Sequence, residues 1–358
     1  MSAAELPAVP SLERHCDAAA LTAALYPRIR YMGSKYKLLP RLAEVFAEVG
    51  GQTALDAFSG SGVVSYLLKR QGFAVTANDM LEFPGVLASA SVVNNSTLLN
   101  AADVERIAGP AADDRDFIRK TFTGVFFTPD DLAFLDSAWS HIAALHGDKR
   151  ALAISALVLS AARKQPRGVF TISGDLSSYD DGRRDLRISM RDHFVEHADD
   201  YNRTVFRGPS AQVTRQEAAL LDSRPYDLVY LDPPYAPPSD DNCYIKRFHF
   251  LEGLSRYWAG DTLMTGTRTK KLPKPVTGYS NKRTIVEALR GTFKRFRDAG
   301  AIVLSYGSNA LPDKETITDL LLEVKRDVEV RAIPHTYHYG THEAAARRSV
   351  DEYIFIAR

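Results

Sequence analysis

The sequence is poor in cysteine and contains no long apolar run. Its 358 residues include two cysteines, Cys16 and Cys243, too few for a disulfide framework or a cysteine zinc site, which fits a reducing cytosol. No apolar stretch reaches the roughly 20 residues of a membrane-spanning helix. The first 25 residues lack a basic start followed by an apolar block, so we expect no signal or transit peptide. These absences favour a cytoplasmic protein with no membrane partner.

An excess of charge of one sign is also missing. Lys and Arg number 45 against 44 acids, for a formal net charge of +1. Overall charge therefore gives no attraction to nucleic acid, and any site for a polyanion has to be a local patch. With 45% hydrophobic and 25% charged residues, the composition is that of an ordinary globular protein with one large or two smaller domains.

The hydrophobic pattern predicts an α/β sheet that is interrupted by a helical module. The stretch ALDAFSGSGVVSYLLKRQGFAVTANDM from Ala54 reads as a strand, a glycine loop, a helix over Val63–Arg70 and a second strand that ends at Asp79. Sheet character returns in YDLVYLD, GAIVLSYGS and VDEYIFIAR. We therefore expect a mobile lead-in with a short helix over 1–25, a sheet domain over 26–93 and 207–358, and an inserted, mainly helical module over 94–206.

The glycine loop DAFSGSG suits a nucleotide-like ligand. Gly60 and Gly62 let the backbone approach a ligand closely, and the helix that follows offers unpaired N–H groups. Asp79, at the end of the next strand, can accept hydrogen bonds from ribose hydroxyls. The match to the dinucleotide fingerprint is partial, because Ser65 stands where a third small residue is wanted and Asp56 opens the loop. A purely structural turn stays open on these residues alone.

The strand YDLVYL ends in Asp232, Pro233, Pro234 and Tyr235. Prolines stop the chain from continuing as strand or helix and restrict the residues before them. The backbone is thus stiffened where an acid and an aromatic residue emerge. The alternative interpretation is a strand-ending turn with a surface acid.

Three stretches follow one another along the chain in the order of known sequence motifs. They are RYMGSKYKLLP at 30–40, DAFSGSG at 56–62 and DPPY at 232–235. Together they resemble the alpha group of amino-DNA methyltransferases, the DNA adenine methylase (Dam) class. In that class a lysine-bearing motif comes first, and a target-recognition domain lies between the glycine loop and the DPPY motif. VLSYGSN at 303–309 and VDEYIFIA at 350–357 resemble two further motifs. The resemblance implies a Rossmann-like, S-adenosylmethionine-dependent methyltransferase sheet with an inserted recognition module.

The resemblance also implies roles for individual residues. Those expected to bind the cofactor S-adenosylmethionine are Tyr31, Lys35, Asp56, Phe58, Gly60, Gly62, Asp79, Glu217 and Asp232. Glu217 stands where the family pattern has an aspartate for the cofactor's adenine amine, so its extra methylene would demand a shifted adenine or loop.

The chemistry of an amine target gives the DPPY turn a purpose. The exocyclic amine of adenine is a poor nucleophile because its lone pair is delocalised into the ring. Asp232 and the Pro233 carbonyl could accept both amine hydrogens, Pro234 stiffens the turn, and Tyr235 offers an aromatic face to a base rotated out of the duplex. Direct in-line displacement needs no metal, so we expect none, although His335, His338 and His342 are closely spaced.

Basic residues near aromatic residues or in polar loops are candidates for DNA contact. The candidates are Lys246, Arg247, Lys270 and Lys271 after the DPPY turn, and Arg167, Arg183 and Arg184 in the inserted module. Phosphate contacts would give sequence-blind affinity, while contacts from the module would read bases. Solvated basic loops are the alternative.

We therefore predict a site-specific N6-adenine methyltransferase that acts on double-stranded DNA. N4-cytosine methylation, methylation of RNA or of a protein amide, and a non-catalytic DNA-binding relative are the alternatives. The intact Asp232 favours adenine, since the cytosine enzymes more often carry Ser there. We expect a monomer or weak dimer, associated with the nucleoid of a bacterial-type cytoplasm, with a cognate restriction endonuclease as a possible genetic partner.

Overall fold

The computed structural model describes residues 11–166, 168–171, 182–235, 243–275, 277–338 and 347–358. Its centre is a seven-stranded sheet in the order β3-β2-β1-β4-β5-β7-β6. The strands are β1 (Thr53–Asp56), β2 (Ala74–Asn78), β3 (Gln212–Thr214), β4 (Leu228–Leu231), β5 (Ala301–Gly307), β6 (Val328–His338) and β7 (Arg347–Ala357). The strands β3, β2, β1, β4 and β5 are parallel, and β7 and β6 are antiparallel to their neighbours. The expected Rossmann-like α/β class is confirmed.

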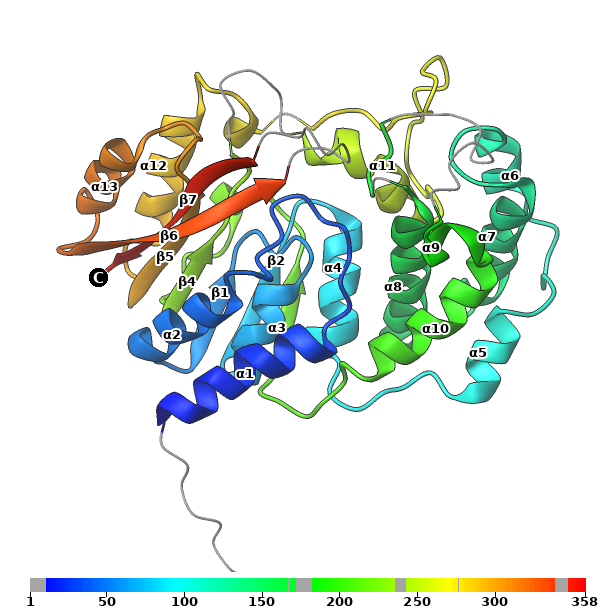
Figure 1. The fold of residues 1–358 in the computed structure, drawn as a ribbon, viewed down its shortest axis with the longest axis horizontal. Coiled ribbons are helices and arrows are strands. Elements are labelled where there is room, and N and C mark those ends of the chain that lie inside the picture. The colour runs from blue at the N-terminus through cyan, green and yellow to red at the C-terminus, as the bar shows by residue number, and fades with distance from the viewer. Residues whose placement is uncertain (1–10, 167, 172–181, 236–242, 276, 339–346) are drawn as a thin grey trace, which may run out of the picture.

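Helices cover both faces of this sheet (Figure 1). Those of the sheet half are α1 (Ser11–Leu25), α2 (Leu39–Val49), α3 (Val63–Arg70), α12 (Ile285–Arg295) and α13 (Lys314–Leu322). Alternate residues of the buried strands face two different cores. On β1, Ala54 lies in the core shared with α1, α2 and α3, whereas Leu55 lies in the core shared with α12 and α13. The sheet is therefore the middle of three layers.

A second group of helices lies beside the sheet, on the right of Figure 1. It contains α4 (Glu82–Ala88), the π-helix η1 (Ser89–Val93), α5 (Ala101–Ile107), α6 (Phe117–Phe122), α7 (Pro129–Ile142), α8 (Gly147–Lys164), α9 (Arg184–Arg187), α10 (Met190–Asn202) and α11 (Tyr244–Leu254). Helix α8 is its centre, with almost every residue from Ala151 to Ala162 buried.

Helix α11 follows the DPPY turn in sequence but packs into the core of the helical group. Phe248, Phe250 and Leu251 are fully buried there. The indole Nε1 of Trp139 on α7 donates a hydrogen bond to the carbonyl of Leu254, at 2.9 Å. The segment after the DPPY turn therefore connects the sheet to the helical group.

The fold brings three acids to one edge of the sheet. Asp56 ends β1, Asp79 follows β2 and Asp232 follows β4. Since these strands are adjacent and parallel, with β1 in the middle, their carboxyl ends lie side by side. Ligands of open α/β sheets bind at this edge, where connections leave in opposite directions. The topology thus places the two expected ligand-binding acids and the DPPY acid together.

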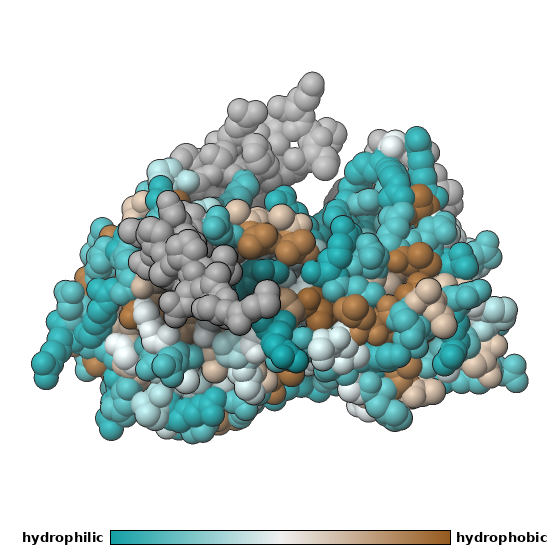
Figure 2. Space-filling view, turned by 90° about the horizontal axis from the view of Figure 1, so that it is seen from below, coloured by the Kyte–Doolittle hydropathy of each residue, from teal (hydrophilic) through white to brown (hydrophobic). Residues whose placement is uncertain are grey.

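Figure 2 shows one face of the molecule, coloured by hydropathy. Polar residues cover most of that face, and hydrophobic residues gather in its middle. Among the described residues, no helix combines the length and the apolar character needed to cross a bilayer.

Two glycines test how tightly α11 is packed. A Cβ at Gly253 would lie 2.1 Å from the Trp258 indole, whereas one at Gly291 on α12 meets nothing within 4 Å. We expect Gly253→Ala to lower the free energy of unfolding by about 2 kcal/mol through overpacking, and Gly291→Ala to raise it by about 0.5 kcal/mol through helix propensity. Urea denaturation measures both. Equal effects of the two substitutions would contradict this packing.

Candidate active site

A cavity opens at the carboxyl edge of the sheet, above the three acids. It encloses about 940 Å³ with its open mouth included. Its walls come from residues 31–35, 56–64, 79–81, 230–234, 243–245 and 274–279, and not every residue of these ranges contributes. The walls therefore join the segment before β1, the glycine loop, the turn after β2, the DPPY turn and the start of α11.

Most of the predicted ligand-binding residues meet in this cavity. Those that line it are Tyr31, Lys35, Asp56, Phe58, Gly60, Asp79, Asp232 and Pro234. Gly62 lies behind the wall, where an added Cβ would be 2.4 Å from the Tyr26 hydroxyl. Glu217 precedes the short helix η3 (Ala218–Leu220) and does not belong to the lining.

The glycine loop is shaped by a close approach of Tyr31. Gly60 has φ +49°, and a Cβ there would lie 2.8 Å from the Tyr31 ring. The Gly60 N–H donates to the carboxylate of Asp79, at 3.0 Å. A side chain at this position would both strain the backbone and push Tyr31 aside. The loop is thus tied to the turn after β2 and open toward the cavity.

The cavity wall contains two acids, the buried Asp56 and the partly exposed Asp79, together with two buried hydroxyls. Burial raises the pKa of Asp56 to about 7 and that of Asp79 to about 6. Ser65 donates to one oxygen of Asp56 at 2.6 Å. The other oxygen of Asp56 and the hydroxyls of Ser34 and Ser59 meet no hydrogen-bond partner within the described chain. Buried polar atoms are usually paired, so these atoms are candidates for ligand contacts.

An aromatic cluster surrounds Tyr31 where this residue borders the glycine loop. Tyr31 stacks on Phe248 of α11, with ring centroids 5.0 Å apart and an interplanar angle of 3°. Tyr244 and Phe83 approach the same ring at 5.4 and 6.1 Å. Helix α11 therefore supports the residue against which Gly60 rests.

The carboxylate of Asp232 is held by one of its two oxygens. Its Oδ1 accepts from Lys35 Nζ at 2.8 Å and from the Ser305 hydroxyl at 3.1 Å, and the Tyr235 hydroxyl lies 3.3 Å from it. No described residue donates a hydrogen bond to Oδ2, and Asp232 lines the cavity. Burial raises the pKa of Asp232, and the Lys35 ammonium opposes that rise. The arrangement fixes the carboxylate and leaves one oxygen for a ligand.

Glu352 of β7 is a second carboxylate in this centre. It is 2% exposed, accepts from the Tyr235 hydroxyl at 2.6 Å, and lies 3.6 Å from Lys35 Nζ. Burial lowers the pKa of Lys35, but Asp232 and Glu352 raise it by more, so its net shift is upward. The ammonium therefore serves two carboxylates, and Tyr235 is held between them.

Sequence reasoning missed part of this site. Glu352 is one of two adjacent acids, with Asp351, in the strand stretch VDEYIFIA, and this pair was the available signal. Ser305 lies in the quoted stretch VLSYGSN and contacts Asp232. Lys274 belongs to the basic loop GTRTKKLPKP, for which we expected phosphate contacts, yet it lines the cavity.

The predicted DNA-binding residues are dispersed over several segments. Lys246 and Arg247 lie on α11, and Lys270 and Lys271 lie in the loop that follows it. Arg183 precedes α9, and Arg184 on α9 pairs with Glu196 of α10 at 3.0 Å. Arg167 falls outside the described residues, as does His342. Their role in DNA binding stays a prediction.

The raised pKa of Asp56 predicts a specific pH dependence of stability. On folding, the pKa of the Asp56 carboxyl rises from its usual value of about 4 to about 7. The wild type therefore has its full stability below about pH 4, and it loses stability as the pH rises toward 7. Asp56→Asn removes that loss. Relative to the wild type, the free energy of unfolding of the variant should be larger at pH 8 than at pH 5 by about 2 kcal/mol.

Urea denaturation at both pH values makes the measurement. The control is Asp313→Asn at the exposed start of α13, where the pKa of the acid is lowered instead. An equal difference at pH 5 and pH 8 for Asp56→Asn would show that this carboxyl is not perturbed.

Comparison with known proteins agrees with this geometry. The model of the family described as D12 class N6 adenine-specific DNA methyltransferase matches residues 31–121, which include Tyr31, Lys35, the glycine loop and Asp79. The chain is 30% identical over 328 residues to the type II methyltransferase M2.HphI of Haemophilus parahaemolyticus, covering 87% of this chain and 92% of that protein.

Two further relatives are larger proteins. The modification methylase StsI of Streptococcus sanguinis is 23% identical over 345 residues, and the type II methyltransferase M.FokI of Planomicrobium okeanokoites is 23% identical over 362 residues. Each match covers 91% of this chain but 51% and 52% of the relative, respectively. The chain thus spans about half the length of these two relatives. All three names describe methyltransferases or a methylase.

Proposed function

Since the chain belongs to the D12 class of N6 adenine-specific DNA methyltransferases, we propose that its cavity binds S-adenosylmethionine and presents Asp232 to a target adenine. The prediction of an adenine-specific DNA methyltransferase is confirmed, and DNA is its substrate. The observation that carries the proposed mechanism is the carboxylate of Asp232, which Lys35 and Ser305 hold by one oxygen while the other is left for a ligand.

The cavity fits an adenosine-bearing donor. Close approach of backbone at Gly60, the carboxylate of Asp79 and the unpaired atoms of Asp56 and Ser59 supply the contacts that a ribose and an amino acid moiety need. Tyr31 and Phe58 supply apolar surface. When bound, S-adenosylmethionine supplies an electrophilic methyl group on a sulfonium. Glu217 lies outside the lining, but its charge acts on the cavity residue Tyr279, so a contact with the donor's adenine stays part of the proposal.

Asp232 and the backbone of Pro233 would activate the adenine amine. The free oxygen of Asp232 and the Pro233 carbonyl accept its two hydrogens, which localises the lone pair on nitrogen. Asp232 would accept one amine proton when the nitrogen takes the methyl group that the bound donor would supply. Lys35 and Ser305 keep the carboxylate in place during this step.

Tyr235 and Glu352 would position the target. The hydroxyl of Tyr235 donates to Glu352 at 2.6 Å and lies 3.3 Å from Asp232, and its ring centroid lies 4.7 Å from that of Tyr306. A ring fixed in this way loses little conformational freedom when a flipped base stacks on it. Glu352 is therefore proposed to orient Tyr235 and Lys35 rather than to contact the base.

The remaining features of the proposal concern DNA and partners. The module over 94–206 would read bases in double-stranded DNA, and Arg183, Lys246 and Lys270 are among the residues proposed to contact it. Because M2.HphI is named a type II methyltransferase, a cognate restriction endonuclease is proposed as the genetic partner. The protein would act as a monomer or weak dimer beside the nucleoid in the cytoplasm.

Methyl transfer to DNA tests the roles of the donor and of Asp232. Incubation with S-adenosylmethionine labelled in its methyl group and unmethylated double-stranded DNA should give labelled N6-methyladenine. Asp232→Asn should lower the rate about 10³-fold or more, because it removes the anionic acceptor. Binding of S-adenosylhomocysteine should persist, and the exposed control Asp222→Asn should keep full activity.

Three results would contradict the proposal. Label that appears in RNA or protein but not in DNA would exclude the substrate, and label in N4-methylcytosine would exclude the target base. An active Asp232→Asn variant would exclude the role of this carboxylate.

A further inference from the structure

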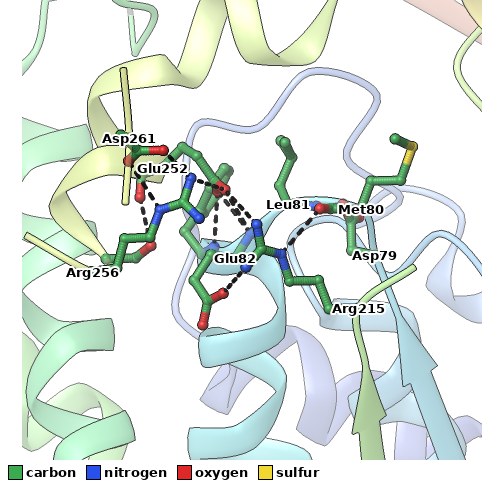
Figure 3. Close-up of polar contacts among 10 residues, drawn as sticks. Asp79, Met80, Leu81, Glu82, Arg215, Glu252, Arg256 and Asp261 are labelled. Atoms are coloured by element: carbon green, nitrogen blue, oxygen red, sulfur yellow. Dashed lines mark hydrogen bonds and ion pairs between the residues drawn. The ribbon is translucent and has the colours of Figure 1, made fainter. Parts of the chain in front are cut away.

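Glu252 is a buried acid outside the catalytic centre. It lies on α11 with 2% exposure, and its carboxylate accepts from the backbone N–H groups of Glu82 at 2.8 Å and of Phe83 at 3.2 Å. Those N–H groups belong to the first turn of α4. A carboxylate from one helix therefore caps the start of another (Figure 3).

The capping group of α4 comes from another helix, because the residue at the N-cap position of α4 lines the cavity. The residue before the helix is Leu81, which supplies no capping side chain and lines the cavity instead. The first N–H groups of a helix need acceptors and favour negative charge. Glu252 meets both needs, although burial raises the pKa of its carboxyl and these backbone bonds only partly offset the rise.

Two arginines surround this carboxylate without replacing its backbone partners. Arg256 lies 3.4 Å from it and makes its shorter contacts with Asp261. Arg215 lies 3.8 Å from it and contacts Glu82 at 2.5 Å and the Met80 carbonyl at 3.4 Å. Figure 3 shows both guanidinium groups turned toward Glu252. The charge of Glu252 is thus compensated, and Arg215 also contacts the turn after β2.

This network joins two walls of the donor cavity. One wall is the turn Asp79–Leu81, in which the Leu81 N–H donates to Asp79 at 3.0 Å. The other is the first turn of α11, which contributes Tyr244 and Ile245. Glu252 lies two turns further along the same helix and bonds directly to the residues that follow the Asp79 turn. Its bonds therefore set the separation of the two walls.

We infer that Glu252 is a positioning residue for the methyl donor. It holds the Asp79 turn against α11 and so sets the affinity for the donor without touching the donor itself. This inference rests on the proposed binding of S-adenosylmethionine in the cavity. The donor affinity, rather than the rate of the chemical step, is the quantity that Glu252 controls.

Glu252→Gln tests the inference. Glutamine keeps one acceptor but points an N–H₂ group at the N–H donors of α4 and at the arginines. Calorimetric titration with S-adenosylhomocysteine should show a Kd about tenfold higher than in the wild type, while kcat at saturating donor stays within about threefold. The matched control is Glu287→Gln on α12, an exposed glutamate that pairs with Arg290 and should leave the Kd unchanged.

A second variant covers the case in which Glu252→Gln does not fold. The side chain of Arg215 is about half exposed, so its replacement is less disruptive to folding. Arg215→Met removes the contacts with Met80 and Glu82 and should raise the Kd about threefold. A lower melting temperature with an unchanged Kd would overturn the inference, as would a fall in kcat with an unchanged Kd. If the wild type itself bound no S-adenosylhomocysteine, the proposed donor would be wrong, and the inference would fall with it.

Discussion

The buried ion pair between Lys35 and Asp232 is the interaction on which the site depends. Both side chains are removed from most solvent, and a buried carboxylate without a cation would hold its proton and lose its value as an acceptor. The ion pair also joins the segment before β1 to the turn after β4. The same Lys35 ammonium lies 3.6 Å from Glu352 and so connects both to β7. Three distant parts of the sequence therefore have to fold together before one oxygen of Asp232 is presented to the cavity.

The shape of the cavity also depends on contacts between residues that are distant in the sequence. Gly60 takes its shape from Tyr31, Tyr31 is supported by Phe248 of α11, and α11 caps α4 through Glu252. Helix α11 also follows the DPPY turn and packs into the helical group. Through its own contacts, helix α11 thus links the helical group to the Asp79 turn of the cavity.

The sequence predicted those parts of the site whose signals are local. The helix Val63–Arg70 has the predicted bounds, and Asp79 directly follows β2, because a glycine loop and two short apolar strands are complete signals in themselves. Strand β6 was not predicted, because Pro334 and charged residues such as Glu329 and Arg331 interrupt its apolar pattern. Glu352 was missed because only the packed sheet brings its carboxylate to Lys35. The Dam-class resemblance suggested Glu217 from its order in the chain, but order does not determine which side chains line a cavity.

The most direct test of this account is the pH dependence of a single turnover. Lys35→Met removes the cation beside Asp232, so the pKa of that carboxyl should rise. With donor and DNA saturating, the acid limb of the rate profile should move upward by about one pH unit or more relative to the wild type. An acid limb at the same pH in both proteins would show that Lys35 does not keep Asp232 ionised, and would contradict the account.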